Sequence, residues 1–120
     1  MAWTGAVAEG CDAAIVDNAG FLQYYRVSIV RYTLSRGIAP IGRERLFATA
    51  GGLASFGEEG TDLYRRAAAH VDKVLKGTPV SQIPVEQASK FELVLNQQTA
   101  KALGLTIPPA LLIRADEVIE

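Results

Sequence analysis

The sequence predicts an α/β fold with a parallel sheet, because short apolar runs alternate along the chain with segments of helical periodicity. The runs at residues 13–16, 38–41 and 53–56 are each followed by a helical pattern. Strands that alternate with helices pair in parallel through right-handed crossovers. Their carboxyl ends meet at one edge of the sheet, where such proteins bind their ligands. The 120 residues match the length of one ordinary domain.

In the first half of the chain, turn residues set the element boundaries. The run at residues 13–16 predicts a buried strand that ends in a polar loop. One helix is predicted over residues 21–36, because apolar residues recur there at helical spacing and Gly37 follows where a left-handed residue is favoured. After the strand at 38–41, residues 43–50 predict a brief helix closed by Gly51-Gly52.

The strongest pattern is an amphipathic helix over residues 61–76. Thr61 is its predicted N-cap, and Gly77 follows its last turn. Asp62 in the first turn and Lys73 in the last agree with the helix dipole. We expect one apolar face of this helix to be buried, formed by Leu63, Ala67, Val71, Val74 and Leu75.

The last third of the chain begins with a connecting loop over residues 78–89. A strand follows at 91–95, and Asn96 is the predicted N-cap of a short helix that ends at Gly104 in a Schellman motif. Residues 110–120 predict either a final helical turn or a docking tail.

Composition excludes several classes of function. Twelve basic and thirteen acidic side chains give a net charge of -1, so no overall field attracts nucleic acid or anionic lipid. One cysteine, Cys11, and one histidine, His70, are too few for a disulfide or a common zinc site, and we expect no cofactor. The sequence has neither a membrane-spanning apolar run nor the pattern of a secretory signal.

No segment carries a convincing catalytic set, so we do not expect an enzyme. His70 is the single histidine, and a catalytic or metal site is difficult to build from one histidine. Ser55 lacks the flanking glycines of a nucleophile elbow, and Cys11 has no basic neighbour that would lower the pKa of its thiol. Residues 57–61 lack the Lys-Ser/Thr of a phosphate loop. Asp17 follows the first strand as a receiver-domain phosphoacceptor would, but no acidic cluster precedes it, so loop polarity is the simpler reading.

Three loops that follow or flank predicted strands combine small, polar and aromatic residues. They cover residues 17–21, 42–44 and 51–57. In a parallel sheet these loops converge on one edge and offer backbone donors, a hydroxyl, charges and aromatic faces. They suit a small polar or zwitterionic ligand, although ordinary loops have the same composition.

Five segments follow one another along the chain: GLASFG at 52–57, DLYRRAAAHVDKVLKG at 62–77, IPVEQ at 83–87, KFELVLN at 90–96 and TAKALGLTIPP at 99–109. Together they resemble the C-terminal part of the ABC-transporter substrate-binding protein family that includes the tryptophan-binding, TrpX-like lipoproteins. The resemblance runs from about residue 10 to residue 120, is strongest after Gly51, and departs from the commoner Pro-containing loop at Asp17-Asn18.

The resemblance implies a fragment of a type I periplasmic-binding-protein-like fold, in which two α/β lobes hold a solute. Residues 1–50 would belong to the C-terminal lobe, 51–57 would cross the hinge, and 58–120 would supply elements of the opposite lobe and the C-terminal tail. Most of that second lobe would be missing. The orphaned apolar faces would then be exposed, and we expect a homodimer that buries them.

By resemblance, the protein is the solute-binding component of an ABC importer, is not an enzyme, and binds a small organic solute such as an amino acid. Its partners would be that solute and a permease, and its location periplasmic or membrane-anchored outside the cytoplasm. We expect acidic or amide groups to bind the ammonium, Ser55 and glycine amides the carboxylate, and an aromatic ring the side chain. The alternative is a truncated, non-binding module that only self-associates. The expected ligand-binding residues are Asp17, Asn18, Phe21, Gly52, Ser55 and Phe56.

Overall fold

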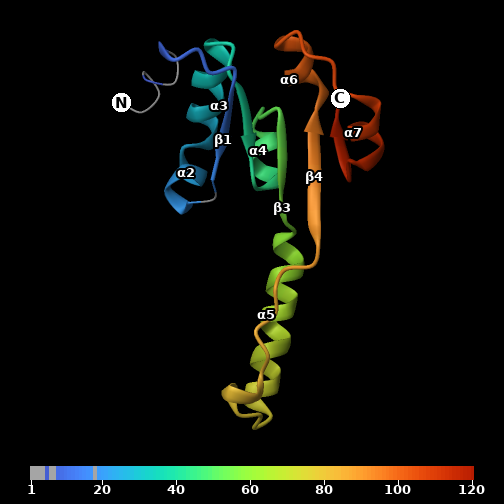
Figure 1. The fold of residues 1–120 in the computed structure, drawn as a ribbon. Helices are drawn as coiled ribbons and strands as arrows, with labels where there is room; N and C mark the ends of the chain where they lie inside the picture. The colour runs from blue at the N-terminus through green and yellow to red at the C-terminus, as the bar shows by residue number, and fades with distance from the viewer. Residues whose placement is uncertain (1–4, 6–7, 18) are drawn as a thin grey trace. The chain divides into compact units, whose positions relative to one another are not determined.

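The computed structural model describes residues 5, 8–17 and 19–120. The chain divides into two compact units (Figure 1). Unit 1 combines the residues up to Gly57 with Glu92–Glu120, and unit 2 is Glu58–Phe91.

A five-stranded sheet forms the centre of unit 1, with its strands in sequence order. Pairing is parallel between the first and second strands, the second and third, and the fourth and fifth. The third and fourth strands run in opposite directions, so the sheet is mixed (Figure 1). The strands are β1 (Ala13–Val16), β2 (Ala39–Gly42), β3 (Ala54–Glu58), β4 (Phe91–Asn96) and β5 (Glu117–Ile119).

The helices of unit 1 follow the predicted alternation, with one correction. The helix predicted over 21–36 is two helices, because Tyr25 leaves helical geometry at ψ 8°. Helical spacing does not reveal this break, since the Tyr25 N–H still donates to Phe21 O at 3.4 Å and its carbonyl accepts from Ile29 N at 2.9 Å. The helices are α2 (Gly20–Tyr24), α3 (Arg26–Ser35), α4 (Arg45–Thr49), α6 (Gln97–Ala102) and α7 (Pro109–Arg114).

One face of the sheet carries the core. Val16 packs there with Ile29 and Val30 of α3 and Phe47 of α4. Gly42 at the end of β2 lies directly under the Phe47 ring, where any Cβ would overlap the ring atoms. The absence of a side chain at Gly42 therefore lets α4 approach the sheet closely.

The opposite face of the first three strands carries exposed apolar side chains in the part of unit 1 that the structure describes. Register places Ile15, Ile41 and Ala54 in one row across these strands. Ile15 is 82% exposed and Phe56, two residues after Ala54, is 57% exposed. A central parallel sheet is ordinarily covered on both faces, so the exposed side chains here form an apolar surface patch of unit 1.

The predicted start and end of α6 are confirmed. The Asn96 side chain accepts a hydrogen bond from Thr99 N at 3.0 Å. At the other end, Gly104 has φ 69°, and its N–H and that of Leu105 donate to Lys101 O and Ala100 O. This is the predicted Schellman motif.

The C-terminal segment forms both a helix and a strand. After α7, β5 pairs in parallel with β4, and the Arg45 guanidinium on α4 binds the Glu117 carboxylate with two hydrogen bonds of 2.7 and 2.8 Å. The sequence of residues 110–120 predicts a helical turn or a docking tail, so the strand β5 is a feature that the sequence patterns do not indicate.

Unit 2 is the helix α5 (Gly60–Leu75) followed by a return segment that contains η1 (Val80–Gln82). The predicted N-cap, Thr61, is wrong: the cap lies two residues earlier, at Glu59, whose carbonyl accepts from Asp62 N and Leu63 N. Burial of its apolar face is also wrong, since α5 has no buried residue. Within unit 2 only the return segment lies beside it, which leaves Leu63 and Val74 each 42% exposed.

The boundaries of the compact units differ from the expected segments. Residues 92–120 join unit 1 and not the unit of α5. The reason is strand pairing, because β4 and β5 complete the sheet that β1 begins. The assignment of these units to two lobes around a hinge stays a prediction.

Candidate ligand-binding site

The carboxyl ends of β1, β2 and β3 lie together at one edge of the sheet. Register aligns Val16 with Gly42, and Gly42 with Ser55. The next residues along the chain, Asp17, Arg43 and Phe56, form the row that follows at this edge, where Arg43 Nη1 approaches Asp17 Oδ1. Because side chains alternate between faces, this row lies on the sheet face that carries the exposed apolar side chains.

Two members of this row form an ion pair. Arg43 Nη1 lies 3.4 Å from Asp17 Oδ1, and their side chains are 43% and 79% exposed. An ion pair of this length and exposure contributes at most about 1 kcal/mol, because water screens it.

Aromatic rings lie on the helix that follows β1. Phe21 is 69% exposed, and its ring contacts Tyr25 edge-on with centroids 5.1 Å apart. Tyr24 contacts the same Tyr25 ring edge-on at 5.0 Å. This cluster offers exposed ring surface to an apolar ligand group.

The backbone of Arg43 is held by a close approach of β3. A Cβ built on Gly57 would overlap the carbonyl oxygen of Arg43. Only glycine leaves room for this contact, which fixes where the Arg43 segment passes over the end of β3.

The predicted residues separate into an exposed group and a buried group. Asp17, Phe21 and Phe56 are exposed, whereas Ser55 is 1% exposed on the core face. Gly52 is buried against Phe47 and precedes β3. It therefore lies near the amino end of the parallel strands, roughly 13 Å from the Asp17 row by strand rise.

Asn18, also predicted, lies outside the described residues. Sequence reasoning included Arg43 in one of the three converging loops but not among the expected ligand-binding residues. The signal that identifies it is its place directly after β2, the same place that Asp17 has after β1.

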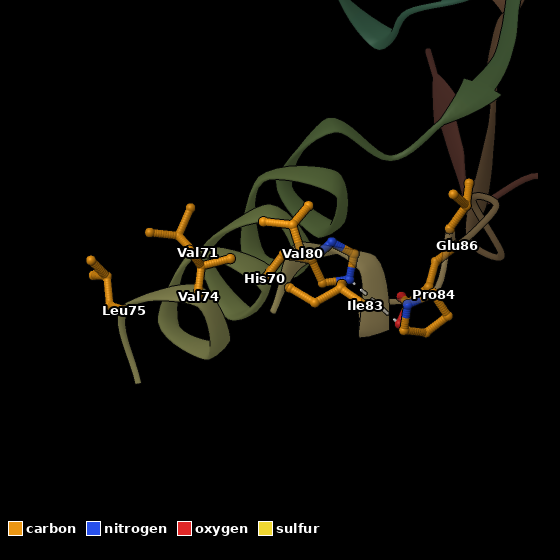
Figure 2. Close-up of a pocket in the computed structure, with 9 residues that line it drawn as sticks. His70, Val71, Val74, Leu75, Val80, Ile83, Pro84 and Glu86 are labelled. Atoms are coloured by element: carbon orange, nitrogen blue, oxygen red, sulfur yellow. Dashed lines mark ion pairs between the residues drawn. The ribbon is translucent and has the colours of Figure 1, made fainter. Parts of the chain in front are cut away.

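Unit 2 carries a second polar cluster, at one end of an apolar pocket of about 540 Å³ (Figure 2). Arg66 donates to Glu86 at 2.6 Å, and His70 Nε2 lies 3.6 Å from the other carboxylate oxygen. The hydrogen bond from Arg66, then the nearby His70, holds the pKa of Glu86 below its ordinary value of 4.5. These contacts join α5 to its return segment. The apolar lining is formed by Val71, Val74, Leu75, Val80, Ile83, Pro84 and Val85.

Among the described residues, no three His, Cys, Asp or Glu side chains gather into a group that could hold a metal ion. Over the same residues, no helix has the length and apolar character needed to cross a membrane.

The fold and this edge define a class of protein: an α/β protein with an exposed polar and aromatic edge where its parallel strands end. A comparison with models of protein families identifies the family within this class. The model described as ABC transporter substrate binding protein matches residues 4–119, and the chain belongs to this family. The family and the predicted fold class are thereby confirmed.

Solved structures agree with this assignment. A conserved domain protein from Vibrio cholerae is 25% identical with a TM-score of 0.88, over 96% of this chain and 39% of its own. An ABC domain from Streptococcus pneumonia in complex with L-Trp is 26% identical with a TM-score of 0.87, over 97% of this chain and 40% of its own.

A third structure supports the fold alone. It is the ligand-free, open form of a substrate-binding protein with adhesive properties from Clostridium difficile, 22% identical with a TM-score of 0.67. The match covers 97% of this chain and 38% of that one, so the chain spans about two-fifths of each structure's length. No curated protein matches the chain.

Proposed function

We propose that this chain forms one side of the solute site of an ABC-type importer's binding protein, and that the solute is an amino acid with an apolar or aromatic side chain. Family membership carries the transport role. The L-Trp complex of a relative with a TM-score of 0.87 supports the solute class. The protein holds and delivers its solute without chemical change, so it is not an enzyme.

The carboxyl edge of the sheet supplies the groups such a solute needs. An amino acid carries an ammonium, a carboxylate and a side chain, and the edge presents the acid Asp17 and the rings of Phe21 and Phe56. Charged and aromatic groups that converge on a strand-end edge are typical of small-molecule sites in α/β proteins. The expected partners are this solute and the transporter's permease, and the expected location is extracytoplasmic.

Calorimetric titration of the 120-residue chain with L-tryptophan, L-phenylalanine, L-glutamate and L-lysine tests this proposal. We expect saturable heat with the aromatic amino acids, at an affinity reduced to about the millimolar range because one side of a site makes fewer contacts. Weaker or no heat is expected with glutamate and lysine. Absence of saturable heat with all four amino acids would contradict the proposal.

A second candidate is a non-binding module that self-associates. The observation that favours it is the exposed apolar surface in each unit, with Ile15 82% exposed on the sheet and Leu75 81% exposed on α5. A two-fold dimer is the simplest assembly that buries such surfaces. Self-association without any amino-acid heat would favour this candidate over solute binding.

A further inference from the structure

We infer that a second copy of this chain docks on α5, with the two α5 helices packed antiparallel about a two-fold axis. One stripe of the helix, which we call the α5 seam, forms this surface: Tyr64, Ala68, Val71 and Leu75. The inference goes beyond the proposed solute site, because the α5 seam belongs wholly to unit 2. Its test does not depend on solute binding.

The α5 seam has the spacing of a surface that pairs two helices. Its residues recur at intervals of four, three and four along the 16 residues of α5. This alternation keeps apolar side chains on the side of a helix that faces a second helix. All four side chains are exposed, with Tyr64 at 80% and Leu75 at 81%. Burial of the α5 seam against an equally apolar surface is therefore favourable.

Side-chain size makes the α5 seam complementary to itself in the antiparallel direction. A two-fold interface pairs each residue with another residue of the same surface. Antiparallel packing places Tyr64 opposite the partner's Leu75, and Ala68 opposite the partner's Val71. Small side chains then face larger ones in the central layers, which close packing requires. A parallel pair would instead place two Tyr64 rings in one layer and two Ala68 methyl groups in another.

The apolar pocket of unit 2 extends the same surface. Val71 and Leu75 belong both to the α5 seam and to the pocket lining, near the C-terminal end of α5 (Figure 2). Tyr64 lies near the other end of the helix. Antiparallel packing therefore carries the Tyr64 ring of each copy toward the pocket of the other. The exposed ring and the pocket are the two complementary parts that a self-recognising surface needs.

Charges beside the α5 seam favour the same direction. Arg65 and Asp72 are seven residues apart on one flank of it, and their side chains are 70% and 58% exposed. In an antiparallel pair this flank faces itself, so Arg65 lies opposite the partner's Asp72 at two symmetric contacts. A parallel pair would face it with the other flank, which carries Ala67 and Val74 and no charge. Each charge also has an opposite charge one turn away on α5, so the contacts between copies complete a network.

Charge reversal at this flank tests the inference. Sedimentation equilibrium measures the dimer dissociation constant of the unmodified 120-residue chain, of Arg65→Glu and of Asp72→Arg. Each variant places like charges together at both contacts, and we expect each to weaken the dimer roughly threefold to tenfold. In an equimolar mixture of the two variants, opposite charges meet at both contacts, so we expect the mixed dimer to form as tightly as the unmodified one. Arg31→Glu, at an exposed arginine of α3, is the control for charge reversal elsewhere and should leave the dimer unchanged.

The outcomes separate this inference from the proposed function. A mixture that dimerises no more tightly than either variant alone would overturn the antiparallel pairing. Dimers that neither variant weakens would place the interface on another surface, and a chain that stays monomeric at all micromolar concentrations would leave no interface to assign; either result would overturn the inference. Calorimetric heat with L-tryptophan should be the same for all of these chains, so its loss in the unmodified chain counts against the solute site alone.

Discussion

Gly57 shows at the residue scale how the fold shapes the edge site. Because a Cβ there would overlap the Arg43 carbonyl oxygen, we predict that Gly57→Ala displaces the Arg43 segment. The expected cost in the free energy of unfolding is about 1–3 kcal/mol, as in other overpacked sites. Urea denaturation measures it. Gly20→Ala in the same unit is the control, since no atom lies within 4 Å of its added Cβ, and we expect a change within about 0.5 kcal/mol.

Glu86 gives a second residue-scale prediction, on pH. Its pKa is lowered from 4.5 in the folded state by Arg66 and His70, so the folded carboxylate holds a proton less tightly than the unfolded one. The stabilisation is then present above 4.5 and is lost as the pH falls through the lowered pKa.

We therefore expect Glu86→Gln to speed amide hydrogen exchange in α5 at neutral pH, and the difference from the unmodified chain to shrink below pH 4.5. Asp72→Asn is the control, because Asp72 pairs with Lys76 on the same helix and joins no second segment. If Glu86→Gln changes the exchange rate equally at neutral pH and below pH 4.5, the ion pair does not hold the return segment against α5.

At the element scale, Asn96 joins α6 to α4. Its side chain accepts from Thr99 N at 3.0 Å and donates to Ala48 O at 3.2 Å, and the residue is only 5% exposed. Aspartate would keep the cap but lose the donor, and would bury a charge against a carbonyl oxygen.

We predict that Asn96→Asp destabilises at least as much as Asn96→Ala, by about 1–3 kcal/mol each. At an exposed cap aspartate is as favourable as asparagine, so this order tests the buried contact with Ala48. Thermal unfolding measures both variants, with the exposed Lys101→Ala as control. An Asn96→Asp variant as stable as the unmodified chain would contradict the role of the donor.

The ends of helices are predictable from the sequence where a nearby residue satisfies the unpaired backbone groups. Asn96 caps the start of α6 and Gly104 ends it, because each residue satisfies backbone groups within one helical turn. The break at Tyr25 and the strand β5 were not predictable, since the first keeps its hydrogen bonds and the second depends on pairing with β4. For the site, sequence order placed Asp17 and Arg43 at strand ends, but only the register brought them together.

At the scale of the whole molecule, each unit exposes apolar surface. Ile15 on the sheet and Leu75 on α5 are 82% and 81% exposed. We predict a concentration-dependent dimer in sedimentation velocity, weakened several-fold by Ile15→Ser or Leu75→Ser because each removes apolar area from the buried interface. Val27→Ser, at a 49% exposed valine of α3, is the control. A monomer at all micromolar concentrations would contradict the dimer.

Solute binding at the carboxyl edge is the central claim, and an amide chemical-shift map of the chain titrated with L-tryptophan tests it most directly. The account predicts saturable shifts at Asp17, Arg43 and Phe56, with the pocket residues Val74 and Ile83 of unit 2 unaffected. Shifts confined to the unit 2 pocket, or no shifts at about 10 mM L-tryptophan, well above a millimolar dissociation constant, would contradict it.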